Sequence, residues 1–467
     1  MKQMDRRLFL KEAGAAVLGA GAAARAAGAV EKRPPNVVLF LIDDMGWRDV
    51  GCYGSRFYET PNIDRLAAQG MRFTQAYAAC PVCSPTRAAV LTGKYPARLH
   101  LTDWIPGHKH PYAKLLPPAF NQELPHEAVT LAEALKPAGY ATASVGKWHL
   151  GGPDFGPEAQ GFDVNAGGTH QGQPPSYFSP YGIPALKDGP EGEYLTDRLT
   201  DEAVAFIESN RERPFFLYFP HYAVHTPIQA KKDVQARYAG RVRDGDPQNN
   251  PGYAAMVEAV DQSVGRVMDA LDRLGLAEDT VVIFTSDNGG LGRVTSNAPL
   301  REGKGTLYEG GVREPLIVRW PGRIAAGSLC GTPVCSVDFF PTIMEIATGP
   351  GPGPLTDGES LVPLLTGTGD IAARDLYWHY PHYHPLGATP GGIVRRGNHK
   401  LIEYYEDNRL ELYDLAADPA ETKNLAGEMS EKAEELRRAL HGWLLDVDAQ
   451  MPTSNPDHDP VRAAQSK

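Results

Sequence analysis

Strongly apolar runs that end in ionisable or polar side chains constrain the fold of this chain more than any other feature. The runs are residues 37–42, 215–219, 281–285 and 316–318, and their composition is typical of strands buried on both faces. Segments with helical periodicity alternate with them, at residues 63–69, 131–135, 196–209 and 253–274. This alternation predicts an α/β fold with helices on both faces of a sheet.

Side chains that suit a functional site follow the first three runs. Asp43 and Asp44 follow the first, His221 and His225 the second, and Asp287 and Asn288 the third. Sites in open α/β sheets assemble outside the carboxyl ends of the strands. We therefore expect these side chains to meet at one edge of the sheet, with His221 as the weaker candidate of the two histidines.

The chain divides into a large and a small folded part. Its 467 residues are enough for two domains, and a Gly/Pro-rich linker spans residues 349–354. We predict a large domain over residues 34–372, a small C-terminal α+β subdomain over residues 373–450, and a loosely held polar tail over residues 451–467. The subdomain prediction rests on an antiparallel hairpin of residues 401–405 and 410–415 and on a last helix that begins near Ser430.

The N-terminus has the features of an export signal. Residues 6–11 read Arg-Arg-Leu-Phe-Leu-Lys, which resembles the twin-arginine consensus. The Ala/Gly-rich residues 13–24 are too few to span a membrane, and residues 27–29 read Ala-Gly-Ala, as at a cleavage site. We predict a twin-arginine signal peptide over residues 1–29, export by the twin-arginine machinery, and a periplasmic or secreted product. A basic leader without consequence is the alternative.

Charge and cysteine content limit the partners. The formal net charge is −11, which disfavours nucleic acid and means that an anionic ligand needs a local basic site. No cysteine lies near the expected cleavage site, so we expect no stable membrane anchor. The chain has five cysteines; if Cys83 is modified, the other four can pair in an oxidising compartment or remain free buried thiols. Those four are Cys52, Cys80, Cys330 and Cys335.

The most specific stretch of the chain surrounds Cys83. It reads Cys83-Ser84-Pro85-Thr86-Arg87 and continues to Leu91-Thr92-Gly93-Lys94. Pro85 fits the first turn of a helix, so residue 83 is expected at a helix N-terminus, where an anionic ester is favoured. Cys80 and Cys83 also form a C-x-x-C pair, which would suit redox chemistry or half of a zinc site. A buried structural cysteine is a further alternative.

This stretch resembles the signature of the sulfatase family, in which the cysteine of a C-x-P-x-R motif is oxidised to Cα-formylglycine. The agreement covers Cys83, Pro85, Arg87, Leu91, Gly93 and Lys94, whereas Thr86 is a mild departure. The resemblance implies that a formylglycine-generating enzyme acts on the chain during maturation. A hydrated aldehyde carries two geminal hydroxyls, one to attack the sulfur of a sulfate ester and one to eliminate the sulfate afterwards.

Two other segments resemble the metal-binding segments of the same family. The implied ligands are Asp43, Asp44, Asp287 and Asn288 together with the converted Cys83. Carboxylate and amide oxygens suit a hard cation rather than zinc, and we expect one calcium ion per chain. Taken singly, each pair would also suit a solvated turn.

The resemblance also implies catalytic roles for Arg87, Lys147, His149, His225 and Lys304. Arg87 would hold the aldehyde hydrate, and Lys147 and Lys304 would neutralise sulfate oxygens. His149 would be the base of the elimination step, and His225 or Lys304 would protonate the leaving alcohol. Surface lysines and hydrogen-bonded core histidines are the alternatives.

The resemblance covers about residues 34–445 and implies an alkaline-phosphatase-like fold, with a large mixed β-sheet sandwiched between helices and a small C-terminal antiparallel sheet. Trp104, His379, His382 and His384 are candidates for contacts to a sugar, although an aromatic strand edge would explain the three histidines equally well. Residues 379–413 resemble those of glycan-acting members, which favours a carbohydrate substrate. Together with the other segments, the resemblance implies a secreted, calcium-dependent sulfatase whose substrate is a sulfated small molecule or glycan.

Two rival functions remain open at this point. A phosphonate monoester hydrolase or phosphodiesterase of the same superfamily would share the metal site. A non-catalytic binder of sulfated glycans would retain Cys83 as a thiol.

Overall fold

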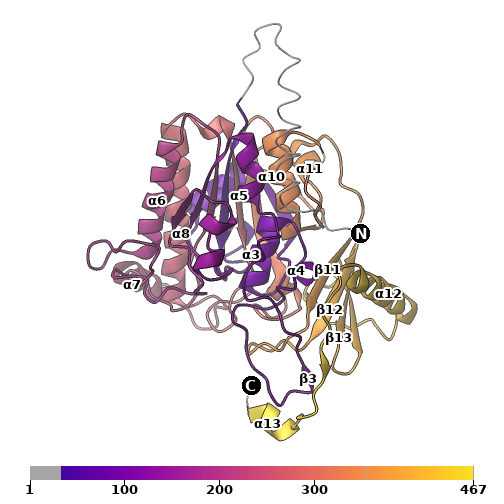
Figure 1. Ribbon diagram of the computed structural model, residues 1–467. Coiled ribbons are helices and arrows are strands. Elements are labelled where there is room, and N and C mark those ends of the chain that lie inside the picture. The colour runs from indigo at the N-terminus through magenta and orange to yellow at the C-terminus, as the bar shows by residue number, and fades with distance from the viewer. Residues whose placement is uncertain (1–32, 352, 466–467) are drawn as a thin grey trace.

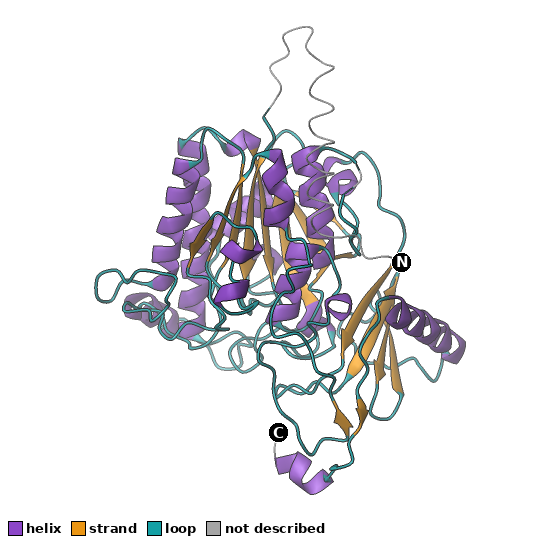
Figure 2. Cartoon of the chain, viewed as in Figure 1, coloured by secondary structure: helices purple, strands orange, loops and turns teal. Residues whose placement is uncertain are grey.

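The computed structural model describes residues 33–351 and 353–465, so the expected signal peptide lies outside the described residues. The described chain forms a large mixed sheet between two layers of helices, with a second, antiparallel sheet beside it (Figure 1, Figure 2). This architecture confirms the predicted fold class. Among the described helices, none is both long and apolar enough to cross a bilayer.

The large sheet is mixed because its central strands run parallel to one another, whereas one strand near its edge runs antiparallel to both of its neighbours. Its strands are β1 (Asn36–Ile42), β2 (Met71–Tyr77), β4 (Ala141–Val145), β5 (Val164–Ala166), β6 (Phe215–Pro220), β7 (Thr280–Ser286), β8 (Arg313–Arg319), β9 (Ser328–Cys330) and β10 (Val334–Cys335). The strand order is β10-β2-β8-β7-β1-β6-β4-β5, and β9 also pairs with β2. In the central strand β1, Val38 pairs in parallel register with Leu217 of β6 and Val282 of β7, whereas β8 runs antiparallel to β7 and β2.

Helices cover both faces of this sheet. One face packs against α2 (Pro61–Gln69), α6 (Leu195–Ser209) and α8 (Pro251–Arg273), with α7 (Lys232–Ala239) against α8. The other face packs against α3 (Cys83–Thr92), α5 (Leu131–Leu135), α10 (Phe339–Thr348) and α11 (Val362–Thr366). Figure 1 shows α6 and α8 on the left of the sheet, and α3, α5 and α10 in front of it and to the right. Two short helices, α4 (Pro96–Leu99) and α9 (Glu309–Val312), lie in connections.

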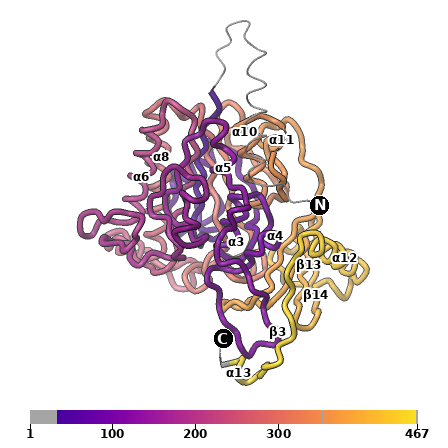
Figure 3. The backbone as a smooth tube through the Cα atoms, in the orientation of Figure 1, coloured from indigo at the N-terminus to yellow at the C-terminus, as the bar shows by residue number. Residues whose placement is uncertain are grey.

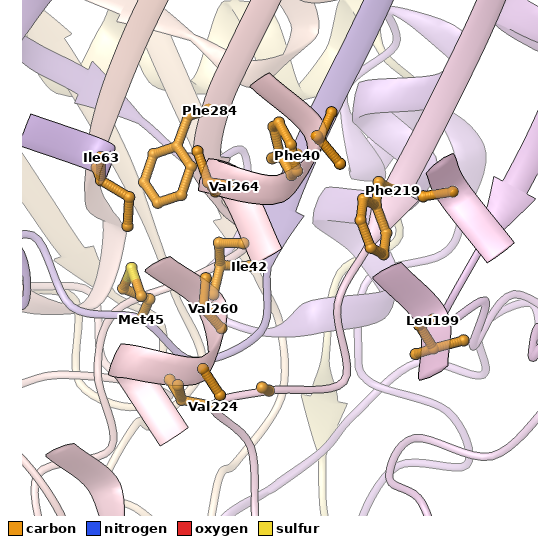
Figure 4. Close-up of a cluster of buried hydrophobic side chains, with 14 of the residues drawn as sticks. Phe40, Ile42, Met45, Ile63, Leu199, Phe219, Val224, Val260, Val264 and Phe284 are labelled. Atoms are coloured by element: carbon orange, nitrogen blue, oxygen red, sulfur yellow. The ribbon is translucent and has the colours of Figure 1, made fainter. Parts of the chain in front are cut away.

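Strand β1 shows why a continuous apolar run was the right signal for a central strand. Its even-numbered residues, such as Phe40, lie in the core under α8, and its odd-numbered residues, such as Leu39, lie in the core under α3. Figure 4 shows the first of these cores, where Phe40 and Phe219 lie near Val260 and Val264 of α8. Burial on both faces leaves no position for the polar residues that alternate in a half-exposed strand.

Local sequence fixes where the main helices begin. The side chain of Asn250 accepts hydrogen bonds from the backbone N–H groups of Gly252 (3.0 Å) and Tyr253 (3.1 Å), so it caps α8, and Pro251 occupies the first turn. Thr130 and Glu133 form a reciprocal capping box at the start of α5. The helices predicted at residues 63–69, 131–135, 196–209 and 253–274 are each present within two residues of the expected bounds.

The C-terminal antiparallel sheet contains β11 (Asp375–Tyr380), β12 (Gly391–Arg396), β13 (His399–Tyr404) and β14 (Arg409–Asp414). The helix α12 (Ser430–Asp446) covers one face, and the other face packs on the large domain around Trp378, Tyr77 and Leu307. The predicted hairpin is present as β13 and β14, which pair in antiparallel register.

The C-terminal tail is held more firmly than its polar composition suggests. Strand β15 (Thr453–Ser454) pairs with β3 (Leu115–Leu116), and helix α13 (Pro460–Gln465) follows. The side chain of Asn455 donates to the backbone oxygens of Pro111 and Ala113. Figure 3 shows the yellow end of the chain returning beside the β3 loop. Pairing with a distant loop is not visible in the tail's own sequence.

Candidate active site

The predicted site residues assemble where four neighbouring strands end. Strands β7, β1, β6 and β4 lie side by side. Beyond their carboxyl ends come, in the same order, Asp287, Asp43, His225 and Lys147. Two hydrogen bonds hold the strand ends together: the backbone N–H of Asp44 donates to the side-chain Oδ1 of Asp287 at 3.2 Å, and the N–H of Val224 donates to the Asp43 carbonyl at 2.8 Å. The structure thus places these side chains at one edge of the sheet, as parallel strands require.

Three buried oxygen atoms at this edge have no hydrogen-bond donor among the described residues: Asp43 Oδ1, Asp44 Oδ2 and Asn288 Oδ1. Burying such atoms without a partner is unfavourable. Asp43, Asp44 and His225 also offer ligand atoms that lie within 4.8 Å of one another. A donor set dominated by carboxylate and amide oxygens fits a hard divalent cation.

Three cations balance the three carboxylates. Arg87 donates to Asp287 Oδ2 from Nε (3.0 Å) and Nη2 (2.7 Å). Lys147 Nζ donates to Asp43 Oδ2 at 2.7 Å, and Lys304 Nζ donates to Asp44 Oδ1 at 2.5 Å. Arg87 Nη2 also lies 3.4 Å from Asp43 Oδ1, an ion-pair distance without a hydrogen bond, so Asp43 and Asp287 share this guanidinium.

Burial and neighbouring charges oppose each other at the three carboxyl groups. Burial is the largest influence on all three and raises the pKa, and at Asp43 it prevails, so that the pKa of this group lies well above its usual value. At Asp44 the charges of Lys304, His225 and Lys147 and a hydrogen bond from Lys304 together outweigh burial, and at Asp287 the charges of Arg87, Lys147 and Lys304 together do so; both pKa values lie below their usual range. Such opposed shifts among neighbouring carboxyl groups are typical of functional sites.

Cys83 is the first residue of α3, as its sequence predicted. Every residue of this helix is buried, and Gly93, with a φ of 66°, ends it. The hydroxyl of Thr86 donates to the carbonyls of Cys80 (3.0 Å) and Val82 (3.2 Å), so this departure from the usual motif stabilises the turn that precedes Cys83. All five cysteines are unpaired, which leaves no disulfide between Cys80 and Cys83.

His149 lies against Cys83 in one defined orientation. Its Nδ1 is 3.4 Å from Cys83 Sγ, and its Nε2 is 2.5 Å from the carbonyl oxygen of Ile105. A carbonyl only accepts, so Nε2 carries the proton and the lone pair of Nδ1 faces residue 83. Burial, reinforced by the charge of Lys147, lowers the pKa of His149 well below its usual value, so the ring is neutral. The Ile105 contact could not be found in the sequence, because a backbone carbonyl has no residue signature.

His225 and Lys304 approach Asp44 from different segments. His225 Nε2 is 3.6 Å from Asp44 Oδ2, and its Nδ1 donates to the carbonyl of Thr226 at 2.8 Å. Burial lowers the pKa of His225 to about 3 despite the opposing charge of Asp44. At Lys304 burial lowers the pKa, but the combined attraction of Asp44 and the other acidic groups nearby exceeds it and raises the pKa above its usual value. Lys304 is therefore the protonated member of the pair.

The four candidate sugar contacts have different surroundings. His379 is buried between Tyr405 Oη (2.8 Å) and the Gln450 carbonyl (2.9 Å), and His382 is buried beside Thr102 Oγ1 (2.7 Å). Their ring nitrogens make structural contacts, so the strand-edge alternative describes these two residues. His384 packs on Gly305, where a Cβ atom would lie 2.3 Å from its Nδ1, and is influenced by the charges of Lys304 and Asp44. Trp104 is half-buried and precedes Ile105; its buried Nε1 has no partner among the described residues.

His221, the weaker candidate of its pair, lies outside the cluster of charges. It stacks on Phe219, and its Nε2 is 2.9 Å from the hydroxyl of Ser263. This arrangement makes it a core histidine.

The C-terminal subdomain supports the segment that carries Lys304. Glu309, five residues further on, is buried, accepts a hydrogen bond from Tyr77 Oη at 2.7 Å and pairs with Lys400 Nζ at 3.1 Å. Lys400 also pairs with Glu421 at 2.8 Å, and Glu421 accepts from the backbone N–H of Glu309 at 2.6 Å. Sequence reasoning missed this network because its members are far apart along the chain.

Comparisons with known proteins extend over nearly the whole described chain. The family model described as Sulfatase matches residues 35–349, and the model described as N-sulphoglucosamine sulphohydrolase, C-terminal, matches residues 303–450. A protein named Sulfatase from Formosa agariphila is 35% identical over 496 residues, covering 89% of both chains. Human Arylsulfatase A is 36% identical over 476 residues, covering 89% of this chain and 88% of its own.

A solved structure shows the same fold. The structure of Ps i-CgsB in complex with k-i-k-neocarrahexaose superposes with a TM-score of 0.75 at 29% identity. The match covers 92% of this chain and 96% of that chain.

Proposed function

Because the chain belongs to the sulfatase family, and is therefore an enzyme that hydrolyses sulfate esters, we propose that it acts on a sulfated carbohydrate with a formylglycine made from Cys83 and one calcium ion. The metal would be held by Asp43, Asp44, Asp287 and Asn288 together with the converted residue 83. The observation that carries the proposal is the set of three buried oxygens without donors, at the same edge of the sheet as the start of α3.

The formylglycine and the metal ion would supply the chemistry that the unmodified side chains of this chain lack. A hydrated formylglycine provides a nucleophilic hydroxyl, and a bound divalent cation lowers the pKa of an attached hydroxyl and offsets charge on sulfate oxygens.

The surrounding residues of the chain bind charge and move protons. Lys147 and Lys304 are ammonium groups within reach of the metal carboxylates, and they are placed to hold the oxygens of a sulfate group. The neutral His149, with Nδ1 directed at residue 83, is placed to accept a proton from that side chain. Lys304 rather than His225 is the donor to the leaving alcohol, because Lys304 is the protonated one. Arg87 holds Asp287 in position through two hydrogen bonds.

Three findings support carbohydrate as the substrate class. The structure of Ps i-CgsB contains a neocarrahexaose. The family model that matches residues 303–450 carries the description N-sulphoglucosamine sulphohydrolase, C-terminal. A cavity of about 460 Å³ opens beside Lys304, a volume within the range of small-ligand sites.

A panel assay tests this substrate class. We expect turnover of at least one sulfated mono- or oligosaccharide, measured as released sulfate. Aryl sulfate, a phosphate diester and a phosphonate monoester are assayed in parallel as controls. Preferred hydrolysis of the phosphonate or the diester would replace the proposal with the rival function, and turnover of aryl sulfate without any saccharide would remove carbohydrate as the substrate class.

We also propose that the enzyme leaves the cytosol by the twin-arginine route, since residues 6–11 resemble its consensus. This route carries folded proteins, and Cys83 is buried at the base of the site, so oxidation would precede folding and export. Replacing Arg6 and Arg7 with lysine should leave active, uncleaved protein inside the cell, as measured by fractionation and assay of both compartments. Lys32→Arg, beyond the expected cleavage site, is the control. Unchanged activity outside the cytosol would contradict this route.

A further inference from the structure

A second cavity, rich in arginine, adjoins the one beside Lys304. It has a volume of about 580 Å³, and the side chains of Arg48, Arg56, Arg241 and Arg243 line it. We call these four residues the arginine pocket. Phe57 and Asp246 also line it.

The two cavities have a common wall. Pro247 lines both, Gln248 lines the arginine pocket, and Asn249 lines the cavity of Lys304. Arg48 Nη1 donates to the carbonyl of Ala298 at 3.0 Å, and Ala298 lines the cavity of Lys304. A ligand that extends from the reacting sulfate at Lys304 would reach the arginine pocket along this wall.

The pocket has an excess of positive charge that the fold does not neutralise. Within the described part of the chain, no carboxylate lies within 4.0 Å of the side chains of Arg48, Arg56 or Arg243. Arg241 pairs with Glu59 at 2.5 Å, and Asp246 is the carboxylate on the pocket wall. In a protein of net charge −11, three guanidinium groups around one cavity, with no carboxylate partner among the described residues, point to an anionic ligand.

Two of the arginines are fixed in place before any ligand binds. Arg48 donates from Nε to the carbonyl of Gly54 at 3.2 Å and from Nη1 to Ala298. Arg241 lies over the rings of Tyr238 (5.3 Å) and Phe57 (6.0 Å). Arg56 and Arg243 are exposed, so they can close on a ligand. Guanidinium groups bind tetrahedral oxyanions with paired hydrogen bonds, which suits a sulfate group.

We propose that the arginine pocket binds a further sulfate group on the same saccharide whose reacting ester lies at Lys304, so that the enzyme prefers polysulfated chains. This inference rests on the proposed carbohydrate substrate and adds a distal subsite to it. Continuity with the Lys304 cavity favours a second group of the same ligand over an unconnected anion.

Binding of a short, size-selected dextran sulfate oligosaccharide tests the proposal. The double variant Arg56→Gln with Arg243→Gln removes two exposed charges that make no ion pair with any described residue, so folding should be unaffected. Calorimetry should show binding weakened by about tenfold, or about 1.4 kcal/mol, with a reduced dependence on salt concentration. A monosulfated glucose and inorganic sulfate should bind the variant and the wild type equally.

The matched control removes two exposed arginines elsewhere. Arg323 follows β8 at the end of the sheet opposite the site, and Arg438 lies on α12. Arg323→Gln with Arg438→Gln should bind the oligosaccharide as the wild type does.

Three outcomes would overturn the proposal. These are unchanged binding of the oligosaccharide to the pocket variant, equal loss in the control, and weakened binding of inorganic sulfate alone. The last would identify the pocket as a site for a free anion. The assay measures binding rather than turnover, so its result is separate from that of the saccharide hydrolysis panel.

Discussion

Replacing Cys83 with alanine should lower kcat/KM by at least roughly 10³-fold, or about 4 kcal/mol of transition-state stabilisation, because the proposed nucleophile is made from this side chain. In the wild-type protein, the peptide that contains residue 83 should be about 18 Da lighter than its thiol form, since one sulfur and two hydrogens are exchanged for one oxygen. Mass spectrometry of the isolated peptide and steady-state kinetics measure the two effects.

Cys80→Ala is the matched control for this experiment. Cys80 is also buried and unpaired, and it lies three residues before Cys83, but its thiol is not beside His149. The control should keep its activity within severalfold of wild type, and thermal unfolding shows whether either variant is destabilised. An intact thiol at residue 83 in a fully active wild-type enzyme would refute the proposed nucleophile, as would full activity in Cys83→Ala.

Removing the metal should abolish activity, and the purified enzyme should contain one calcium ion per chain at ligand distances of about 2.3–2.6 Å. The buried oxygens of Asp43, Asp44 and Asn288 that lack donors are the reason for this expectation. Calcium at a hundred times its Kd should also raise the free energy of unfolding by about 2.7 kcal/mol, because the folded state alone binds it. Elemental analysis and thermal unfolding with and without chelator measure the two effects.

Asp44→Asn tests the ligand set directly. The substitution keeps the shape of the side chain but removes its charge and puts an amide NH₂ where one carboxylate oxygen lies. We expect calcium affinity and kcat/KM each to fall by roughly a hundredfold or more. Loss of a group that only hydrogen-bonds to a metal ligand costs up to about a hundredfold, and a direct ligand should matter at least as much. The control is Asp154→Asn, an exposed carboxylate with no ion pair among the described residues. A zinc ion in place of calcium, or full activity after chelation, would contradict the proposed site.

The sequence contained local information from which the central part of the fold could be predicted. Strand β1 could be predicted because burial on both faces demands an unbroken apolar run, and α3 because Pro85 marks a first turn. The position of Asp43 and Asp287 at one edge followed from the rule that parallel strands present their carboxyl ends together. Burial pattern, capping and strand polarity are properties of short segments, so they can be read without knowing the rest of the chain.

The features that only the tertiary structure decided depend on partners that are distant in sequence. The proton position of His149 depends on the carbonyl of Ile105, and the support of the Lys304 segment depends on Lys400 and Glu421. The histidines near residue 380 looked equivalent in sequence, yet packing buried His379 and His382 and left only His384 beside Lys304.

The arginine pocket shows the same limit of sequence reasoning. Arg48 and Arg56 are separated from Arg241 and Arg243 by nearly half of the described chain, and none of the four belongs to a motif that predicts contact with the others. Such contacts form only when loops from separate strand–helix units fold over the same edge of the sheet. The sequence determined the strands, the start of α3 and the residue types of the site, whereas long-range packing determined orientation, charge pairing and the shape of the cavities.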